Sequence, residues 1–189
     1  MNWQNLLALA FLCILVQPAD GQEKTEKKDA PVKVEMLELA KGKVVMAKPE
    51  KWKAVPPKSQ MIDNEFRVAG EGENFARITI MQASGGVQGN IDRWIGQFDG
   101  VKKEDAKVEK KEVDQTKVHI VEITGTFKES MGPGGPGAAT KKQENYKMLG
   151  AILELKDGAL IFIKATGPND IVTGMREGFV KMLDGLKNK

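Results

Sequence analysis

The chain has almost none of the side chains that most readily bind metals or act as nucleophiles. Among its 189 residues there is one cysteine, Cys13, and one histidine, His119. Cys13 lies inside an apolar N-terminal run, so cleavage of that run after export leaves no disulfide, thiolate ligand or cysteine nucleophile. His119 alone cannot form a His-His metal pair, and its place between Val118 and Ile120 is typical of an ordinary strand histidine.

Motifs for nucleotide binding and serine catalysis are missing as well. Residues 132–137 match the letters G-x-G-x-x-G, but Pro133 and Pro136 have no backbone N–H to offer a pyrophosphate, and we expect no helix to follow. No G-x-S-x-G marks a serine nucleophile, and no oxygen-rich calcium loop is present. We therefore expect no cofactor and no metal, and the sequence favours a non-catalytic protein over an enzyme.

The sequence also lacks a concentrated basic stripe. Its 29 basic residues interleave with 26 acidic ones for a net charge of +3, as in the run KKEDAKVEKKE. Such interleaving is typical of a solvated surface and not of a nucleic-acid footprint. We expect no nucleic-acid partner.

The N-terminus predicts export. Residues 6–16 read LLALAFLCILV, which has the length of a signal-peptide apolar region and is too short to span a bilayer, for which about 20 residues are needed. Ala19 and Gly21 are the small residues of a cleavage site before Gln22. Leu12, directly before Cys13, does not fit a lipoprotein site. We expect a periplasmic or secreted protein without a membrane span after cleavage; the uncharged MNWQN start keeps a retained segment as the alternative.

The mature chain is predicted to contain one domain. Residues 1–21 are the signal peptide, residues 22–32 form a Lys- and Glu-rich flexible linker, and residues 33–189 form a single α+β domain. The linker is too polar to bury enough apolar surface to offset its ordering entropy. The domain is long enough for one sizeable core.

Strand and helix patterns in the first half alternate with clear turns. We expect a hairpin in 34–46 around Gly42, a turn-rich passage over 48–57, and strands over 65–69 and 76–83, where Ile78 and Ile80 alternate with polar residues. Four apolar residues then recur at helical spacing and predict a short helix capped by Asn90 and closed at Gly100: Ile91, Trp94, Ile95 and Phe98.

The second half predicts two hairpins and a final helix. Residues 107–113 and 117–127 form one hairpin, residues 146–155 and 159–166 the other, and a long loop over 128–143 joins them. A helix begins at Pro168 and carries an apolar stripe down one side. Because the central strands are apolar on both faces, we expect a mostly antiparallel sheet covered by helices on both faces.

Several passages resemble a known family. They read FRVAGEGENFARITI with NIDRWIGQF, then EITGTF, and finally YKMLGAILEL, IKATGP and FVKMLDGL. Together they resemble a family of uncharacterised exported bacterial proteins over residues 52–186. Their element order is similar to the PsbP-like α/β/α sandwich shared by an extrinsic photosystem II subunit and the Ran-binding Mog proteins. The resemblance implies a fold, and no functional residue is carried over from it.

The candidate functional residues are therefore few. The loop over 128–143 is a candidate partner-binding loop because long loops in compact domains often bind, with these residues as contacts: Met131, Pro133, Pro136, Lys141 and Lys142. Trp52, between Lys51 and Lys53, either packs in the core or lines a groove. Our first hypothesis is a non-catalytic exported module that binds a protein or envelope component. A carboxylate-based envelope hydrolase and a small-ligand carrier remain as alternatives.

Overall fold

The computed structural model describes residues 34–132 and 139–189, which form eleven strands and two α-helices. The proposed signal peptide and linker lie outside the described residues. The helices are α1 (Val87–Ile95) and α2 (Asn169–Asp184), and a short 3-10 turn, η1, covers Lys103–Asp105. The strands are β1 (Met36–Leu39), β2 (Val44–Ala47), β3 (Lys53–Val55), β4 (Asn64–Ala69), β5 (Phe75–Ala83), β6 (Phe98–Asp99), β7 (Lys107–Val113), β8 (Thr116–Ser130), β9 (Thr140–Glu154), β10 (Leu160–Pro168) and β11 (Lys187–Asn188).

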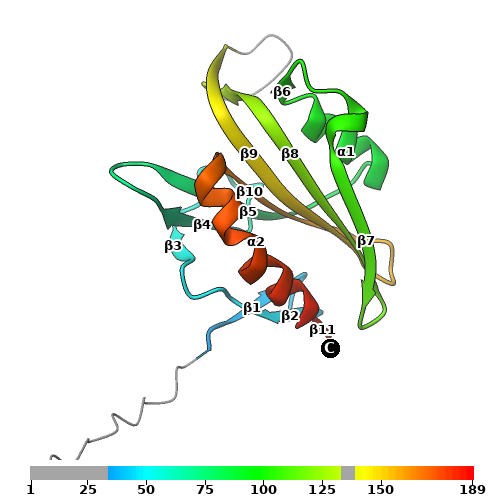
Figure 1. The fold of residues 1–189 in the computed structure, drawn as a ribbon. Coiled ribbons are helices and arrows are strands. Elements are labelled where there is room, and N and C mark those ends of the chain that lie inside the picture. The colour runs from blue at the N-terminus through cyan, green and yellow to red at the C-terminus, as the bar shows by residue number, and fades with distance from the viewer. Residues whose placement is uncertain (1–33, 133–138) are drawn as a thin grey trace, which may run out of the picture. The chain divides into compact units, whose positions relative to one another are not determined.

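These strands build two antiparallel sheets. The large sheet has the order β3-β4-β5-β10-β9-β8-β6, and β7 also pairs with β8; the small sheet has the order β1-β2-β11. The two 15-residue strands β8 and β9 are the longest, and they run side by side beyond the end of β10 (Figure 1). The C-terminal strand β11 closes the small sheet by pairing with β2.

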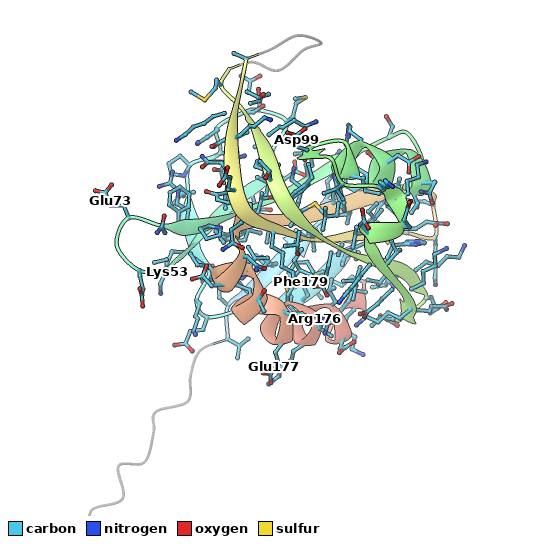
Figure 2. The ribbon with its side chains drawn as sticks, turned by 45° about the horizontal axis from the view of Figure 1, so that its top comes forward. Lys53, Glu73, Asp99, Arg176, Glu177 and Phe179 are labelled. Carbon is cyan, nitrogen blue, oxygen red and sulfur yellow. The ribbon has the colours of Figure 1, made fainter. Side chains whose placement is uncertain are left out.

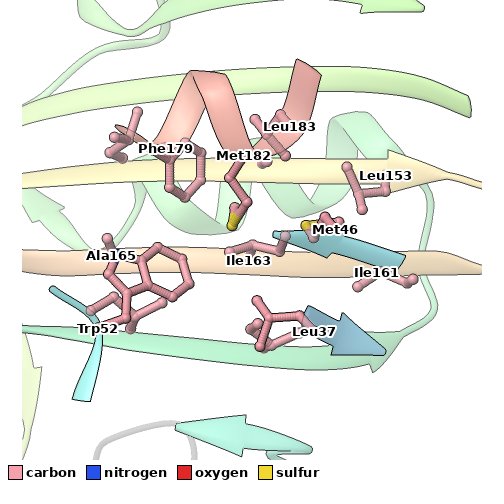
Figure 3. Packing of buried hydrophobic residues seen from close by; sticks show 14 of the residues in the cluster. Leu37, Met46, Trp52, Leu153, Ile161, Ile163, Ala165, Phe179, Met182 and Leu183 are labelled. Atoms are coloured by element: carbon pink, nitrogen blue, oxygen red, sulfur yellow. The ribbon is translucent and has the colours of Figure 1, made fainter. Parts of the chain in front are cut away.

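The main core lies between one face of the large sheet, α2 and the small sheet. Phe179 and Leu183 of α2 meet Ile163 of β10, while Met46 of β2 and Trp52 fill the remaining space, and all five are nearly inaccessible (Figure 3). Each such side chain contributes about 1.5–3 kcal/mol through burial. The apolar stripe of α2 therefore fixes the helix on this face.

A smaller second core lies on the opposite face, under α1. Ile91 and Trp94 of α1 pack against Phe162 and Ile152, and the Trp94 and Phe162 rings meet edge to face with centroids 5.8 Å apart. Gly150 of β9 makes room for the indole, because a Cβ there would lie 2.6 Å from a Trp94 ring carbon. The helix can approach the sheet this closely only at a residue without a side chain.

The predicted α/β/α sandwich with helices covering both sheet faces is wrong. Among the described residues, 51% lie in strands and 19% in helical turns, and the molecule is mostly an antiparallel β structure with two helices. The nine residues of α1 cover only the part of their face near Phe162. The apolar centres of β9 and β10 indicated cover at those positions, but the polar residues farther along the same face do not carry a helix.

The predicted hairpins are confirmed. Their turns could be predicted because each depends only on residues that are neighbours in the sequence. Asp114 and Gln115 have φ of 46° and 64°, the left-handed pair of a tight two-residue turn between β7 and β8. Gly158, with φ of 79°, turns β9 toward β10. Strands β4 and β5, and helix α2 with Pro168 at its N-cap, also occur where the sequence places them.

Other boundaries differ from the predicted ones. Helix α1 begins after Gly86, and Asn90 lies inside it, donating from Nδ2 to the carbonyls of Ser84 and Gly86 at 3.2 and 2.7 Å. Phe98 belongs to strand β6 and not to the helix. The predicted loop over 128–143 is much shorter, since β8 continues to Ser130 and β9 starts at Thr140. Strands β3, β6 and β11 were not predicted; two of them have two residues each and none has a pattern of its own.

Replacing Gly150 by alanine should destabilise the fold, because the new methyl group overlaps the Trp94 ring. We expect a loss of about 1–3 kcal/mol in the free energy of unfolding, measured by urea denaturation. Gly178→Ala is the matched control: Gly178 is exposed in α2 with nothing near its missing Cβ, so the substitution should stabilise by about 0.5–1 kcal/mol. Equal effects at the two glycines would contradict the close packing of α1.

Candidate functional site

The far end of strands β8 and β9 forms a two-stranded arm, which we define as residues 126–132 and 139–145. Pairing continues to Ser130 opposite Thr140, and the Met131 N–H donates to the Ala139 carbonyl at 2.9 Å. β9 pairs with β10 only from Tyr146 onward, so in the described structure residues 140–145 have β8 as a neighbour on one side alone. The arm therefore has a strand edge whose backbone groups are free of sheet pairing.

The predicted loop residues lie on different parts of this arm. Met131 stands at its end with 63% of its surface exposed. Lys141 and Lys142 are exposed residues of β9 and not of a loop. Pro133 and Pro136 lie outside the described residues.

Aromatic packing and one ion pair hold the base of the arm. Phe127 lies between Phe98 and Tyr146, with ring centroids 5.3 and 6.1 Å away, and burial raises the pKa of Tyr146. Lys142 Nζ lies 2.5 Å from Asp99 Oδ2, in the β6 segment that Figure 2 labels beside the arm. The register between β8 and β9 shifts between Gly125 and Phe127, which is the kind of irregularity that bends a strand pair.

Trp52 lies in the main core. Its exposure is 2%, and its ring packs 5.5 Å from Phe66 and 6.2 Å from Phe179. The sequence left two alternatives for Trp52, packing in the core or lining a groove, and the structure shows core packing. The indole has no exposed face to line a groove.

A recess of about 530 Å³ lies beside the start of α1, between the β9–β10 turn and the end of β5. Glu154 is the one ionisable residue in its lining, and the Lys117 hydrogen bond lowers the pKa of Glu154. His119 lies 3.7 Å from Glu154, and burial lowers the pKa of this histidine. The lining does not contain the pair of carboxylates that a glycoside hydrolase uses.

A second cluster of charged residues lies beside α2, and its members form ion pairs with one another. Glu122 accepts from Arg176 Nε at 2.6 Å and lies 2.6 Å from Lys147 Nζ, while Arg176 Nη2 reaches Glu109. Burial alone raises the pKa of Glu122, but the bonds from Lys147 and Arg176 outweigh it and lower that pKa. These charges compensate one another, which indicates a structural role in fixing α2.

The part of the sheet face that α1 leaves uncovered is basic. Pairing places Arg67, Arg77 and Thr166 opposite one another across β4, β5 and β10, and the adjacent row of the same face contains Glu65, Thr79 and Lys164. We call these residues, with Arg93 of α1, the basic face. The basic face was not predicted from the sequence.

Glu65 holds one of these arginines. Arg77 donates from Nε and Nη2 to the Glu65 carboxylate at 2.7 and 2.9 Å, and the Lys58 N–H adds a bond of 2.9 Å. The Arg77 bonds, with that backbone bond, lower the pKa of Glu65 although its side chain is fully buried. Arg67 stacks over Phe75, with its guanidinium carbon 4.2 Å from the ring centroid.

Lys164 has no carboxylate partner among the described residues. Its Nζ donates to Gln97 Oε1 at 3.0 Å. Burial, together with the nearby charges of Arg77 and Arg93, lowers the pKa of Lys164 to about 8. The amine is therefore mostly charged at neutral pH without a counter-ion.

A sequence signal for the basic face does exist. Arg77 and Thr79 alternate with Ile78 and Ile80, and Lys164 and Thr166 alternate with Ile163 and Ala165. Period-two alternation places each polar set on one face. The sequence does not show that β5 and β10 are neighbours, because α1 and the strands β6 to β9 lie between them along the chain.

Comparison with known proteins identifies a fold and not a family. No family model matches the chain, and no curated protein matches it. Among solved structures, the chain is similar to the solution structure of cyanobacterial PsbP (CyanoP) from Synechocystis sp. PCC 6803. The TM-score is 0.50 and the identity 13%, over 82% of this chain and 92% of that one. The fold is therefore PsbP-like.

Within the described ranges, neither helix combines the length and apolar character required to cross a bilayer, and no three His, Cys, Asp or Glu residues come together as a metal site.

Glu65→Gln should reduce the loss in the free energy of unfolding that accompanies acidification. Because the folded pKa of Glu65 is lowered, its carboxylate contributes stability above the unfolded pKa of about 4.3, and this contribution is lost as pH falls through the folded pKa. The variant should be less stable at pH 7 and lose less on acidification, measured by urea denaturation between pH 7 and 3. Glu73→Gln, at the exposed β4–β5 turn, is the control and should follow the parent curve (Figure 2). Parallel pH curves for parent and Glu65→Gln would contradict the role of this pair.

Proposed function

We propose that the chain is an exported, non-catalytic binding module that contacts a protein partner through the arm. The observation that carries the proposal is the free edge of β9 over residues 140–145, at the end of which Met131 is exposed. Free strand edges bind extended segments of other proteins by adding a strand, with backbone bonds supplying affinity and side chains supplying selectivity.

The charges of the arm define the segment that fits. Lys141 and Lys142 border the edge, and lysines at an edge disfavour pairing with an arbitrary strand. Asp99 holds Lys142, so Lys141 is the cation of the β9 edge that is left to meet a partner. An extended segment with an acidic residue opposite Lys141 and an apolar one against Met131 is the best match.

Site-specific photo-crosslinking of the full chain in the producing cells tests this proposal. A photoreactive residue at position 131 or 141 should give one discrete protein adduct, and the same residue at Lys181, exposed on α2, should not. With the photoreactive residue at position 131, Lys141→Glu should lower the adduct yield by about tenfold, the effect of losing one charge pair and replacing it by repulsion. The same adduct from position 181, or an unchanged yield from Lys141→Glu, would contradict the use of the arm.

Export has its own test. Mass spectrometry of the cell-envelope and secreted fractions should find a mature protein that begins at Gln22, because Ala19 and Gly21 precede it as the cleavage site. A protein that begins at Met1 in those fractions would contradict cleavage and favour a retained N-terminal segment.

A further inference from the structure

The basic face carries more positive charge than its own carboxylate neutralises. Four cations gather there, Arg67, Arg77, Arg93 and Lys164, and Glu65 compensates only Arg77. Arg67 and Arg77 lie directly opposite each other in neighbouring strands, an arrangement of like charges that is destabilising. Arg93 donates only to the neutral Asn90 Oδ1, at 2.6 Å.

The same face contains hydrogen-bonding atoms that nothing in the described structure satisfies. Arg67 Nε and Thr166 Oγ1 are buried and have no partner. Lys164 has three N–H groups, and Gln97 accepts one of them. Buried donors without acceptors are costly, and each calls for an explanation such as a ligand.

We propose that the basic face binds a dianionic oxyanion group, a phosphate or sulfate group, coordinated by Lys164, Thr166 and the free donors of Arg67 and Arg77. Arg93 and Gln97, at the end of α1, border this site. The proposed ligands are not residues of the arm, although the Lys128 N–H of the arm donates to the Gln97 carbonyl at 2.8 Å. The proposal does not depend on the function proposed for the arm.

The chemistry of the donors selects this class of ligand. Arginine forks fit the planar edges of carboxylate and phosphate groups, and a lysine adds a point charge. Four cations with one compensated by Glu65 leave three positive charges, so a single carboxylate would leave two of them uncompensated and a dianion would leave one. Every free group on the face is a donor or a hydroxyl, which suits an ion that offers acceptors on all sides.

Titration with two probes tests the site: sodium sulfate and glycerol 3-phosphate, each at constant ionic strength set with sodium chloride. The readout is the backbone amide NMR spectrum of the full mature domain together with calorimetry. We expect saturable binding of at least one probe, with the shifts centred on residues 67, 77, 164 and 166. Shifts that do not saturate, or that lie elsewhere, would overturn the proposal.

Two substitutions separate binding from folding. Lys164→Met removes the amine and keeps the volume, and Thr166→Val removes a hydroxyl that has no partner, so both should leave the thermal midpoint unchanged or raised. Each substitution should lower the affinity for the probe, and Lys164→Met should lower it by about tenfold or more. Lys181→Met, with the same charge change on exposed α2, is the control and should bind as the parent does. Parent-like affinity in both site variants would contradict the proposal.

The pH dependence distinguishes the two ions. The charged groups that face Lys164 are Arg77 from β5 and Arg93 from α1, with Glu65 and Arg67 on β4, while β9 presents Gly150. Binding should weaken for both probes as pH rises through about 8 and Lys164 loses its proton. Below about pH 6 glycerol 3-phosphate also becomes protonated and should bind less tightly, whereas sulfate does not. A flat profile through pH 8, or one retained by Lys164→Met, would contradict the role of this lysine.

Discussion

The pairing of β10 with β5 is the interaction on which both faces of the sheet depend. These strands are joined by no hairpin, yet Lys164 lies opposite Thr79 and Thr166 opposite Arg77. This register turns Ile163 and Ala165 toward α2 and the main core, and it turns Lys164 and Thr166 to the opposite face. Because side chains alternate along a strand, a shift by one residue would place the lysine in the main core. The buried apolar residues therefore fix the position of the basic ones.

The sequence predicts well those parts of the fold that depend on near neighbours. The Asp114-Gln115 and Asp157-Gly158 turns, the strand alternation around Ile78 and the stripe of α2 all have local causes. The start of α1 was misplaced because Asn90, a good capping residue, instead ties its own helix back to Ser84. The loop before β9 was overestimated because Lys141, Lys142 and Gln143 have no strand pattern and are ordered by pairing with β8.

The candidate sites were harder to predict because they depend on contacts between residues that are far apart in the sequence. Met131 was identified from the sequence because it follows a strand and precedes a Gly- and Pro-rich segment. The structure shows that its side chain is exposed. Trp52 has lysines on both sides and still lies among Phe66 and Phe179 in the main core. The basic face combines residues from β4, β5, β10 and α1. The alternation within β5 and β10 places their polar residues on one face, but a single sequence does not show which strands lie side by side.

The unneutralised charge of the basic face disfavours the folded state, and this links the stability of the fold to anion binding. Burial and two neighbouring arginines disfavour the charged form of Lys164, and its pKa falls to about 8 as a result. Any anion that neutralises this charge stabilises the folded state over the unfolded one, since the site exists only when β4, β5 and β10 are paired. The neighbouring Glu65 limits the effect by keeping one edge of Arg77 occupied and in a fixed orientation. Arg77 is thus held in place by Glu65 and Arg67 is stacked on Phe75, and preorganised donors bind with less loss of side-chain freedom than mobile surface lysines do.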